Sequence, residues 1–405
     1  MKKFSLFSLS VIMLLTAGCE GNVPDQTVKI PNVIGQASIS IVGDGMVTTR
    51  STGGRVEFTG GYATGAGLYD GEGYAEVKAI PYSGYQLVSF TGGKVSGNLS
   101  QYTGSSQYGF KIEQSDWQFK VSFKKKIDLR FIAVGENGNI LYYDKGDVTL
   151  RQVGDVLWRS LAYGNGKYVA VGVNGSYGKV AYSTDGLNWT ASDIPDVLAL
   201  YGITYGGGKF VTVGWSQLAY SYDGTNWTRT NVGHKNYNNL QGVAYGNGKF
   251  VAVGTAGHNY TTFAYSSDGI NWSEVDMDAA LYDVVFANGR FVTVGNSYCF
   301  YSANGVNWNS ATLIGTYQSI AYGSSKFVAV GNNGRVAYSS DGSSWTAKTL
   351  MGGVKSWSFF AVTYAIDKFI AIGTNGNLAY SSDGINWETI KTERNVTFRS
   401  ICPIY

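Results

Sequence analysis

The sequence predicts an all-β protein, and three features of its composition carry this prediction. Of the 405 residues, 55 are glycine and 30 are tyrosine, and aromatic residues make up 15% of the chain. Glycine and tyrosine are poor helix formers, whereas tyrosine favours strands and glycine favours tight turns. Hydrophobic residues reach 44%, enough for a folded core, which argues against disorder. Only five prolines, and no Gly-x-y period, exclude a Pro/Gly linker and a collagen-like chain.

The distribution of charge is informative mainly at the N-terminus, where two lysines precede an apolar run. The formal net charge is +3, which gives no basic field for nucleic acid. Lys2 and Lys3 precede an apolar run at residues 4–15, and small residues follow it up to Cys19. This order predicts a secretory signal over residues 1–18, because the run is too short for a membrane span.

The end of this segment, Leu-Thr-Ala-Gly-Cys at residues 15–19, resembles a bacterial lipobox. The resemblance implies that Cys19 is lipidated and anchors the protein to a membrane, with residues 19–35 as a tether. Residue 20 is Glu, not the Asp that tends to hold such lipoproteins in the inner membrane, so the resemblance favours the outer membrane, facing the periplasm or the outside. Thr16 departs from the usual aliphatic residue. The alternative is an ordinary signal peptide with a chance cysteine.

A five-residue apolar block that ends in glycine occurs seven times along the chain. The first copy is Phe-Ile-Ala-Val-Gly at residues 131–135, the last lies at residues 369–373, and the mean spacing is about 40 residues. Each unit reads as four short strands, A to D, with hairpin turns such as Gly-Asn-Gly-Lys at residues 164–167. Four strands every 40 residues or so predict a β-propeller blade, and seven copies predict seven blades. A parallel β-solenoid is the alternative, but its repeats are shorter.

The two ends of the repeat region predict how the ring closes. The first unit begins at strand B, with Arg130, and lacks a strand A. The last residues, 398–405, match strand A of other units, such as residues 158–163. We therefore expect a seven-bladed β-propeller over residues 127–405 in which the C-terminal strand completes the first blade. Closure removes the open sheet edge that would otherwise invite aggregation.

Strands C and D are joined by the motif Ser-x-Asp-Gly-x-x-Trp in five units, and the fifth unit has Asn304 in place of the aspartate. The aspartates are Asp185, Asp223, Asp268, Asp341 and Asp383. A side-chain oxygen at this position accepts backbone N–H groups across the turn, and glycine takes the left-handed position. The motif resembles the Asp-box of bacterial neuraminidase repeats, although in that family one residue separates Asp from Gly. The resemblance implies a structural role in a propeller.

Residues 36–126 carry no blade repeat and are predicted to form a small β-rich module. Residues 117–123 alternate apolar and polar side chains, which is typical of a half-buried strand. Together with residues 79–92, they resemble a divergent internalin-type B-repeat, in which Phe90 stands where the family usually has Trp. The resemblance implies a β-grasp-like surface module that acts as a spacer or binds a partner. Lys124 to Lys126 mark the junction.

The irregular D–A and B–C loops of a propeller open on one face, and functional residues are expected there. The candidate binding residues in these loops and strand entrances are Trp158, Arg159, Tyr201, Trp215, Gln241, Tyr282, Asp283, Gln318, Trp357 and Arg399. The same loops contain His234, Tyr237, His258, Tyr260 and Phe360.

Arg159 and Arg399 occupy equivalent positions on neighbouring blades. Arginine forks suit carboxylates and aromatic faces suit sugar rings, so we hypothesise that the pair binds an anionic or sugar group at the mouth of the propeller. The alternative is that both are ordinary surface or inter-blade residues.

The chain lacks the groups that most enzymes on such a scaffold would need. A glycosidase needs two carboxylates facing one bond, whereas Asp283 is the only acid at a strand A entrance, with Asp196 and Glu393 as loop acids. Sialidases use an arginine triad and carry an Arg-Ile-Pro-like motif on a six-bladed propeller; that motif is not found here, and two histidines provide no metal cluster. The expectation is a binding or scaffold protein with a glycan or protein ligand and without catalysis, cofactor or metal. A sialidase-like hydrolase is the alternative.

Two cysteines remain after Cys19. By the repeat alignment, Cys299 and Cys402 fall in different, non-adjacent sheets. They are therefore predicted to be buried free thiols that fill small apolar spaces. A disulfide in an exported protein is the alternative.

Overall fold

The computed structural model describes residues 36–47, 54–70, 72–126, 128–215, 217–230, 239–255, 261–277, 279–350, 357–391 and 395–405. The predicted signal segment, Cys19 and the whole predicted tether lie outside these residues, as do His234, Tyr237, His258, Tyr260 and Glu393. The chain divides into two compact units, Met1–Lys126 and Ile127–Tyr405. Within the described ranges, no helix is both long and apolar enough to cross a membrane.

The first unit contains two four-stranded sheets that enclose one core. One sheet has the order β4 (Gly67–Asp70), β1 (Gln36–Gly43), β8 (Trp117–Lys125) and β6 (Tyr85–Lys94). The other has the order β2 (Arg55–Phe58), β3 (Gly61–Thr64), β5 (Glu72–Pro81) and β7 (Gln107–Glu113).

The β-rich character of this unit and its alternating strand are as predicted. In β8, Trp117, Phe119 and Val121 are buried while the residues between them are more exposed. The two facing sheets differ from the single sheet that a β-grasp-like module implies. The physical reason is that both sheets present one apolar face, and each face is covered by the other.

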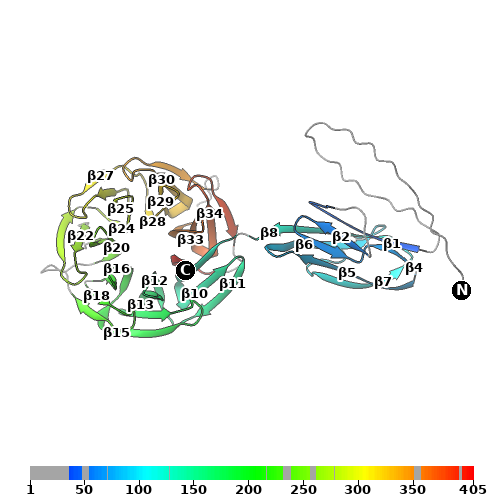
Figure 1. Ribbon diagram of the computed structural model, residues 1–405, viewed down its shortest axis with the longest axis horizontal. Helices are drawn as coiled ribbons and strands as arrows, with labels where there is room; N and C mark the ends of the chain where they lie inside the picture. Colours follow the sequence, from blue (N-terminus) through cyan, green and yellow to red (C-terminus); the bar gives the residue numbers. More distant parts are fainter. Residues whose placement is uncertain are drawn as a thin grey trace. The chain divides into compact units, whose positions relative to one another are not determined.

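The second unit is a ring of seven four-stranded sheets, or blades (Figure 1). Blade 1 comprises β36 (Phe398–Pro403), β9 (Arg130–Gly135), β10 (Asn139–Asp144) and β11 (Asp147–Gln152). Blade 2 comprises β12 (Leu157–Gly164), β13 (Lys167–Asn174), β14 (Tyr177–Ser183) and β15 (Thr190–Leu198), and blade 3 comprises β16 (Leu200–Gly206), β17 (Lys209–Gly214), β18 (Leu218–Ser221) and β19 (Thr228–Thr230). Blade 4 comprises β20 (Leu240–Gly246), β21 (Lys249–Gly254), β22 (Thr261–Ser266) and β23 (Ser273–Met277), and blade 5 comprises β24 (Leu281–Ala287), β25 (Arg290–Gly295), β26 (Cys299–Ser302) and β27 (Asn309–Ala311). Blade 6 comprises β28 (Tyr317–Gly323), β29 (Lys326–Gly331), β30 (Arg335–Ser339) and β31 (Thr346–Thr349), and blade 7 comprises β32 (Phe359–Ala365), β33 (Lys368–Gly373), β34 (Asn377–Ser381) and β35 (Glu388–Lys391).

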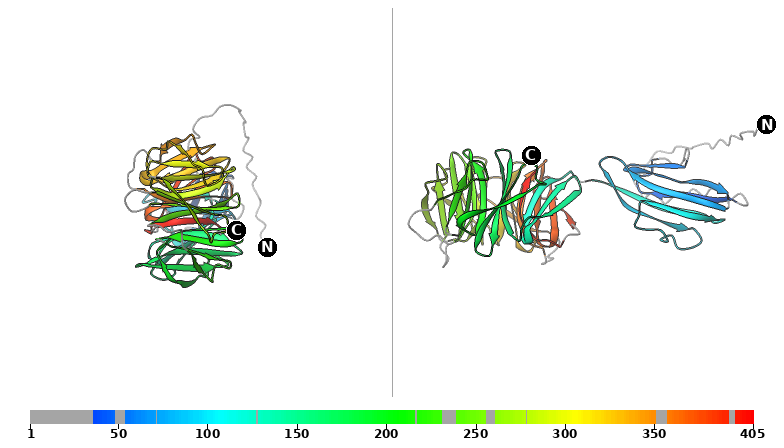
Figure 2. Two further views of the ribbon diagram at one scale, coloured as in Figure 1. Left: turned by 90° about the vertical axis from the view of Figure 1, so that its left-hand side faces the viewer. Right: turned by 90° about the horizontal axis from the view of Figure 1, so that it is seen from below.

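The ring closes as the sequence predicts. The C-terminal strand β36 pairs antiparallel with β9 and supplies the innermost strand of blade 1. The innermost strands contact one another in the order β36, β12, β16, β20, β24, β28, β32 and back to β36. Seen from the side, the strands of the blades run across the thickness of the ring (Figure 2). The seven-bladed propeller with C-terminal strand closure is thereby confirmed.

A steric constraint explains why the repeated block ends in glycine in every copy. A Cβ placed on this glycine would lie 1.8–2.3 Å from the carbonyl oxygen of the residue at the start of the inner strand of the same blade or just before it. In blade 7, for example, the Cβ of residue 373 would lie 1.8 Å from the carbonyl oxygen of Ser358. Seven such approaches account for part of the glycine excess, because any side chain there would collide with backbone.

The Ser-x-Asp-Gly turns use their aspartates to satisfy backbone donors. In blade 2, Oδ1 of Asp185 accepts the N–H groups of Asn188 and Leu187, each at 2.8 Å. Ser183 Oγ donates to the same carboxylate at 2.9 Å and accepts the N–H of Gly186 at 2.8 Å. These backbone bonds hold the pKa of the Asp185 carboxyl well below its usual range. The carboxylate therefore closes the turn, as the sequence predicts for this motif.

Asp185→Ala is expected to lower the free energy of unfolding by about 1–2 kcal/mol, as for loss of a capping side chain. Asp185→Asn should cost less than about 0.5 kcal/mol, because Asn304 in blade 5 accepts the same two backbone N–H groups at 2.9 Å. The depressed pKa means that this stabilisation is present above about pH 4 and is lost as the pH falls further. Denaturant unfolding of both variants at pH 7 and pH 3 measures the difference. Equal losses for Ala and Asn at pH 7 would contradict this account.

Both remaining cysteines are buried and free, as predicted. Burial raises the pKa of Cys299 to about 12 and that of Cys402 to about 12. Each thiol therefore stays protonated at neutral pH and acts as a small apolar core group.

Candidate functional site

Every innermost strand carries a β-bulge near its start. The bulged residue is the second residue of the strand in six blades and the third in blade 2. In β12, for example, the regular pairing shifts between Trp158 and Ser160, so that Arg159 lies outside the ladder. Equivalent shifts occur in the other six inner strands. The seven bulged residues, called the channel ring below, are Arg159, Tyr201, Gln241, Tyr282, Gln318, Phe360 and Arg399.

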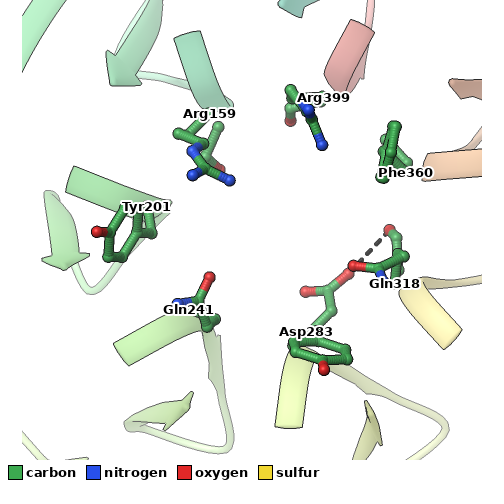
Figure 3. A pocket seen from close by; sticks show the side chains of 12 residues that line it. Arg159, Tyr201, Gln241, Asp283, Gln318, Phe360 and Arg399 are labelled. Atoms are coloured by element: carbon green, nitrogen blue, oxygen red, sulfur yellow. Dashed lines mark hydrogen bonds between the residues drawn. The ribbon is translucent and has the colours of Figure 1, made fainter. Parts of the chain in front are cut away.

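The bulge changes the direction of the side chain. All seven channel-ring residues are half-buried, whereas the residue just before each of them is buried in the core. Bulges of this kind redirect a side chain and often lie beside functional sites. The labelled members of the ring surround a common opening at the centre of the propeller (Figure 3).

This opening is a small pocket, called the channel pocket below, with a volume of about 130 Å³. Besides the channel ring it is lined by Ser160, Asp283, Ser319, Ala361 and Ser400. A water molecule takes up about 30 Å³ of liquid. The channel pocket therefore has room for a small group such as a carboxylate with one or two waters.

Two arginines give one side of the channel pocket a positive charge. Arg399 Nη2 forms an ion pair with Glu136 Oε1 at 2.6 Å, and its guanidinium lies 4.1 Å from the ring centroid of Phe360. The guanidinium of Arg159 lies 5.2 Å from the ring centroid of Tyr201, and no acidic residue of the described chain pairs with it. Burial, and then the charge of Arg399, lower the pKa of Arg159. The charge of Arg159 is thus poorly compensated.

Asp283 lies across the opening from these arginines (Figure 3). Its carboxylate accepts hydrogen bonds from Val284 N at 2.8 Å, Ser319 Oγ at 2.9 Å and Ile320 N at 3.0 Å. Burial raises the pKa of Asp283 to about 6, against the effect of these bonds. Because two of the donors belong to the next blade, Asp283 connects blades 5 and 6.

Serines make the same connection between other blades. Ser160 Oγ accepts the N–H of Ile203 at 3.2 Å between blades 2 and 3. Ser319 Oγ accepts the N–H of Val362 at 3.3 Å between blades 6 and 7. The residue that follows the bulge therefore connects neighbouring blades, and nothing in the sequence around Ser160 and Ser319 marks this role.

The channel pocket brings together seven of the ten predicted binding residues: Arg159, Tyr201, Gln241, Tyr282, Asp283, Gln318 and Arg399. Phe360 completes the ring. Trp357 does not reach this pocket. It packs against the core between blades 6 and 7, with its ring edge-on to Phe359 at 6.3 Å.

Trp158 is not a surface binding residue, which corrects the sequence-based prediction. Its side chain is fully buried, and its Nε1 donates to the carbonyl oxygen of Val153 at 3.2 Å. The reason is its place directly before the bulge, where Leu200 and Phe359 of other blades are also buried. The bulge exposes Arg159 and leaves Trp158 in the core.

Trp215 lies at a second, larger cavity, called the blade 2–3 pocket below, with a volume of about 560 Å³. This pocket is lined by Arg159, Val173, Gly175, Ser176, Leu198, Ala199, Tyr201 and Trp215. Arg159 and Tyr201 belong to both pockets, so the two cavities adjoin. No sequence pattern marks the aliphatic members of this pocket, because Val173 and Leu198 resemble ordinary strand residues.

The described residues contain no group of three or more His, Cys, Asp or Glu side chains placed to hold a metal ion. Among the residues lining the channel pocket, Asp283 is the single acid. The chemistry that this site offers is cationic and hydrogen-bonding, from two arginines and two glutamines.

No protein-family model and no curated protein matches the chain. Solved structures similar to it include YCF48 bound to D1 peptide, at 17% identity and a TM-score of 0.47, over 60% of this chain and 85% of that one. Apo AztD from Citrobacter koseri matches at 11% identity and a TM-score of 0.47, over 67% and 97%. A chain of a nidogen/laminin complex matches at 13% identity and a TM-score of 0.43, over 67% and 97%. Similarity at this level assigns no function to the chain.

Proposed function

We propose that this chain is a binding protein that holds a small anionic group, a carboxylate of a protein or glycan partner, in its channel pocket. The observation that carries the proposal is the poorly compensated charge of Arg159 beside Arg399. A carboxylate would accept charge-assisted hydrogen bonds from guanidinium groups, which are stronger than neutral ones. Gln241 and Gln318 add amide donors around the same opening.

A hydrolase on the same scaffold has weaker support. Hydrolysis of a glycoside commonly needs two carboxylates about one bond, and the one acid lining the channel pocket, Asp283, accepts three hydrogen bonds from blades 5 and 6. We therefore propose binding without turnover. Release of product from fluorogenic sialosides or other glycosides by the purified chain would contradict this proposal.

The proposal for the cellular location of the protein rests on the sequence alone. We propose an outer-membrane lipoprotein anchored through Cys19, with the Asp-box-like turns as framework and residues 36–126 as spacer or partner-binding module. Two acyl chains or more give a stable anchor, whereas one alone is marginal. Metabolic labelling with palmitate should mark the full chain, and labelling that persists in Cys19→Ser would overturn the anchor.

The binding proposal is tested by calorimetric titration of the full chain with paired probes. Acetyl-Gly-Gly-Gly-Ala with a free C-terminal carboxylate is compared with its C-terminal amide, and glucuronic acid with glucose. We expect the acid of at least one pair to bind at least tenfold more tightly than its neutral counterpart. Equal affinities within both pairs would overturn the proposal.

Affinity for the acid probe is expected to rise several-fold as the pH falls from 7.5 to 5. Asp283, with a pKa of about 6, loses its charge over this range and no longer repels a bound carboxylate. The peptide carboxylate has an ordinary pKa near 3.5 and stays ionised. Because the folded state holds the Asp283 proton more tightly than the unfolded chain, the free energy of unfolding should also decrease as the pH rises from about 4 to 6.

The matched variant for this prediction is Asp283→Asn, which keeps an acceptor for Ser319 and Ile320 but has no charge. Its affinity for the acid probe should stay constant between pH 7.5 and 5. A variant that keeps the full pH dependence would show that another group causes it.

A further inference from the structure

The blade 2–3 pocket differs from the channel pocket in both size and chemistry. Its 560 Å³ fall within the range of ligand pockets, whereas the 130 Å³ of the channel pocket admit only a small group. Val173, Leu198, Ala199 and Trp215 give it an apolar wall, and Arg159 is the one charged residue among those that line it. Such a wall provides few hydrogen-bonding partners for the hydroxyl groups of a sugar.

Among the tryptophans of the described residues, Trp215 alone is exposed, while the others are buried or half-buried. Its side chain is 45% exposed, although tryptophan is largely buried on average. Its backbone N–H donates to the carbonyl oxygen of Ala199 at 2.9 Å, which ties the loop after β17 to the loop before β16. The N–H of Leu198 donates to Oε1 of Gln217 at 2.8 Å. The loops that form the pocket wall are therefore held together by hydrogen bonds before any ligand arrives.

Arg159 and Tyr201 form the boundary between the two pockets, because both residues line each of them. A ligand whose carboxylate lies on Arg159 in the channel pocket would thus have its next substituent at the entrance of the blade 2–3 pocket. In a polypeptide, a free carboxylate shares its Cα with an apolar side chain only at the C-terminal residue, because Asp and Glu carry their carboxylates at the end of the side chain itself.

We infer that the ligand is the C-terminus of a polypeptide whose last residue is apolar: the carboxylate lies on Arg159 and Arg399, and the apolar side chain occupies the blade 2–3 pocket against Trp215 and Leu198. This inference rests on the proposed function, since it names the ligand of the same arginines. Trp215 is then the residue that determines specificity.

The test compares acetyl-Gly-Gly-Gly-Phe with acetyl-Gly-Gly-Gly-Ala, each as free acid and as amide, by calorimetric titration of the full chain, with glucuronic acid alongside. The Phe acid is expected to bind at least tenfold more tightly than the Ala acid. Trp215→Ala should remove this preference, so that the ratio of the Phe-acid to the Ala-acid affinity falls close to one. Ser176→Phe, which fills the pocket from an exposed turn residue, should have the same effect.

The matched control is Tyr298→Ala. Tyr298 lies in the equivalent loop of blade 5 and is 47% exposed, close to the 45% of Trp215, but it lines neither pocket. This variant should bind all the probes as the unmodified chain does.

The outcomes separate this inference from the proposed function. If both peptide acids bind equally, or if the preference for Phe survives both Trp215→Ala and Ser176→Phe, the inference is overturned and the carboxylate site stands. If glucuronic acid binds more tightly than either peptide acid, the polypeptide ligand is overturned. If no acid binds better than its neutral counterpart, the proposed function is overturned together with the inference.

Discussion

Removal of residues 398–405 is expected to abolish cooperative folding of the propeller. These residues form β36, which pairs with β9 and buries Phe398 and Ile401 in the core of blade 1. Burial of these two side chains alone is worth about 3–6 kcal/mol. The stability of a whole domain is typically about 5–15 kcal/mol. The deletion would also leave β9 as an open edge, which promotes aggregation.

Tryptophan fluorescence and size-exclusion chromatography would measure this loss, because nine of the ten tryptophans lie in residues 127–405. The matched control removes Tyr405 alone, which stacks on Tyr163 at 4.9 Å and donates its N–H to Tyr168 at 2.9 Å. That variant should fold with a loss of about 1–2 kcal/mol. A synthetic peptide of residues 396–405 should partly restore the truncated chain. A truncated chain that melts cooperatively at an unchanged temperature would show that closure is dispensable.

The double variant Arg159→Ala/Arg399→Ala is expected to lose at least 100-fold in affinity for acetyl-Gly-Gly-Gly-Ala with a free carboxylate. A hydrogen bond to a charged group contributes about 1.5–3 kcal/mol, and tenfold in affinity corresponds to about 1.4 kcal/mol. Each single variant should therefore lose about tenfold or more. Calorimetric titration at pH 7 measures both. Arg151→Ala, an exposed arginine on β11 of blade 1, is the control and should bind normally.

The stability of the two single variants provides an independent readout. Burial and Arg399 lower the pKa of Arg159, so the folded state disfavours its charge, and Arg159→Ala should leave the melting temperature unchanged or raise it. Arg399→Ala should lower it, because Glu136 loses its partner and Phe360 loses a packed guanidinium. A lower melting temperature for Arg159→Ala would indicate that Arg159 stabilises the fold and would contradict its assignment as a ligand-binding residue.

The repeat pattern was sufficient to predict the propeller, its seven blades and its closure. The pattern is strong because the same local features recur in seven units. These features are a hairpin turn, an alternating strand, and a glycine whose Cα lies close to a carbonyl oxygen, as at Gly373. The same alignment placed Arg159 and Arg399 at equivalent positions, which the common bulge explains. In the first unit, the pairing of two separate sheets depends on contacts that are distant in sequence, and the resemblance did not supply them.

The site could be predicted only in part because side-chain direction depends on the bulge. Trp158 and Arg159 are adjacent in sequence, yet one is core and the other lines the channel pocket. Glu136 pairs with Arg399 from 263 residues away, a contact that no local pattern contains. The blade 2–3 pocket likewise joins Val173, Leu198 and Trp215 from three separate segments.

Because of the bulges, the residues that line the channel pocket are different from the residues that form the core of each blade. Each channel-ring residue lies outside the regular strand pairing and outside the core, while the residue before it and the glycine of the repeated block bear the steric demands of the blade. A substitution at one of the seven positions can thus alter the ligand without altering the strand pairing of the blades, although a change at Arg399 also removes its ion pair with Glu136. The scaffold therefore offers seven adjustable positions around a single opening, and relatives with the same architecture would be expected to diverge first at these positions.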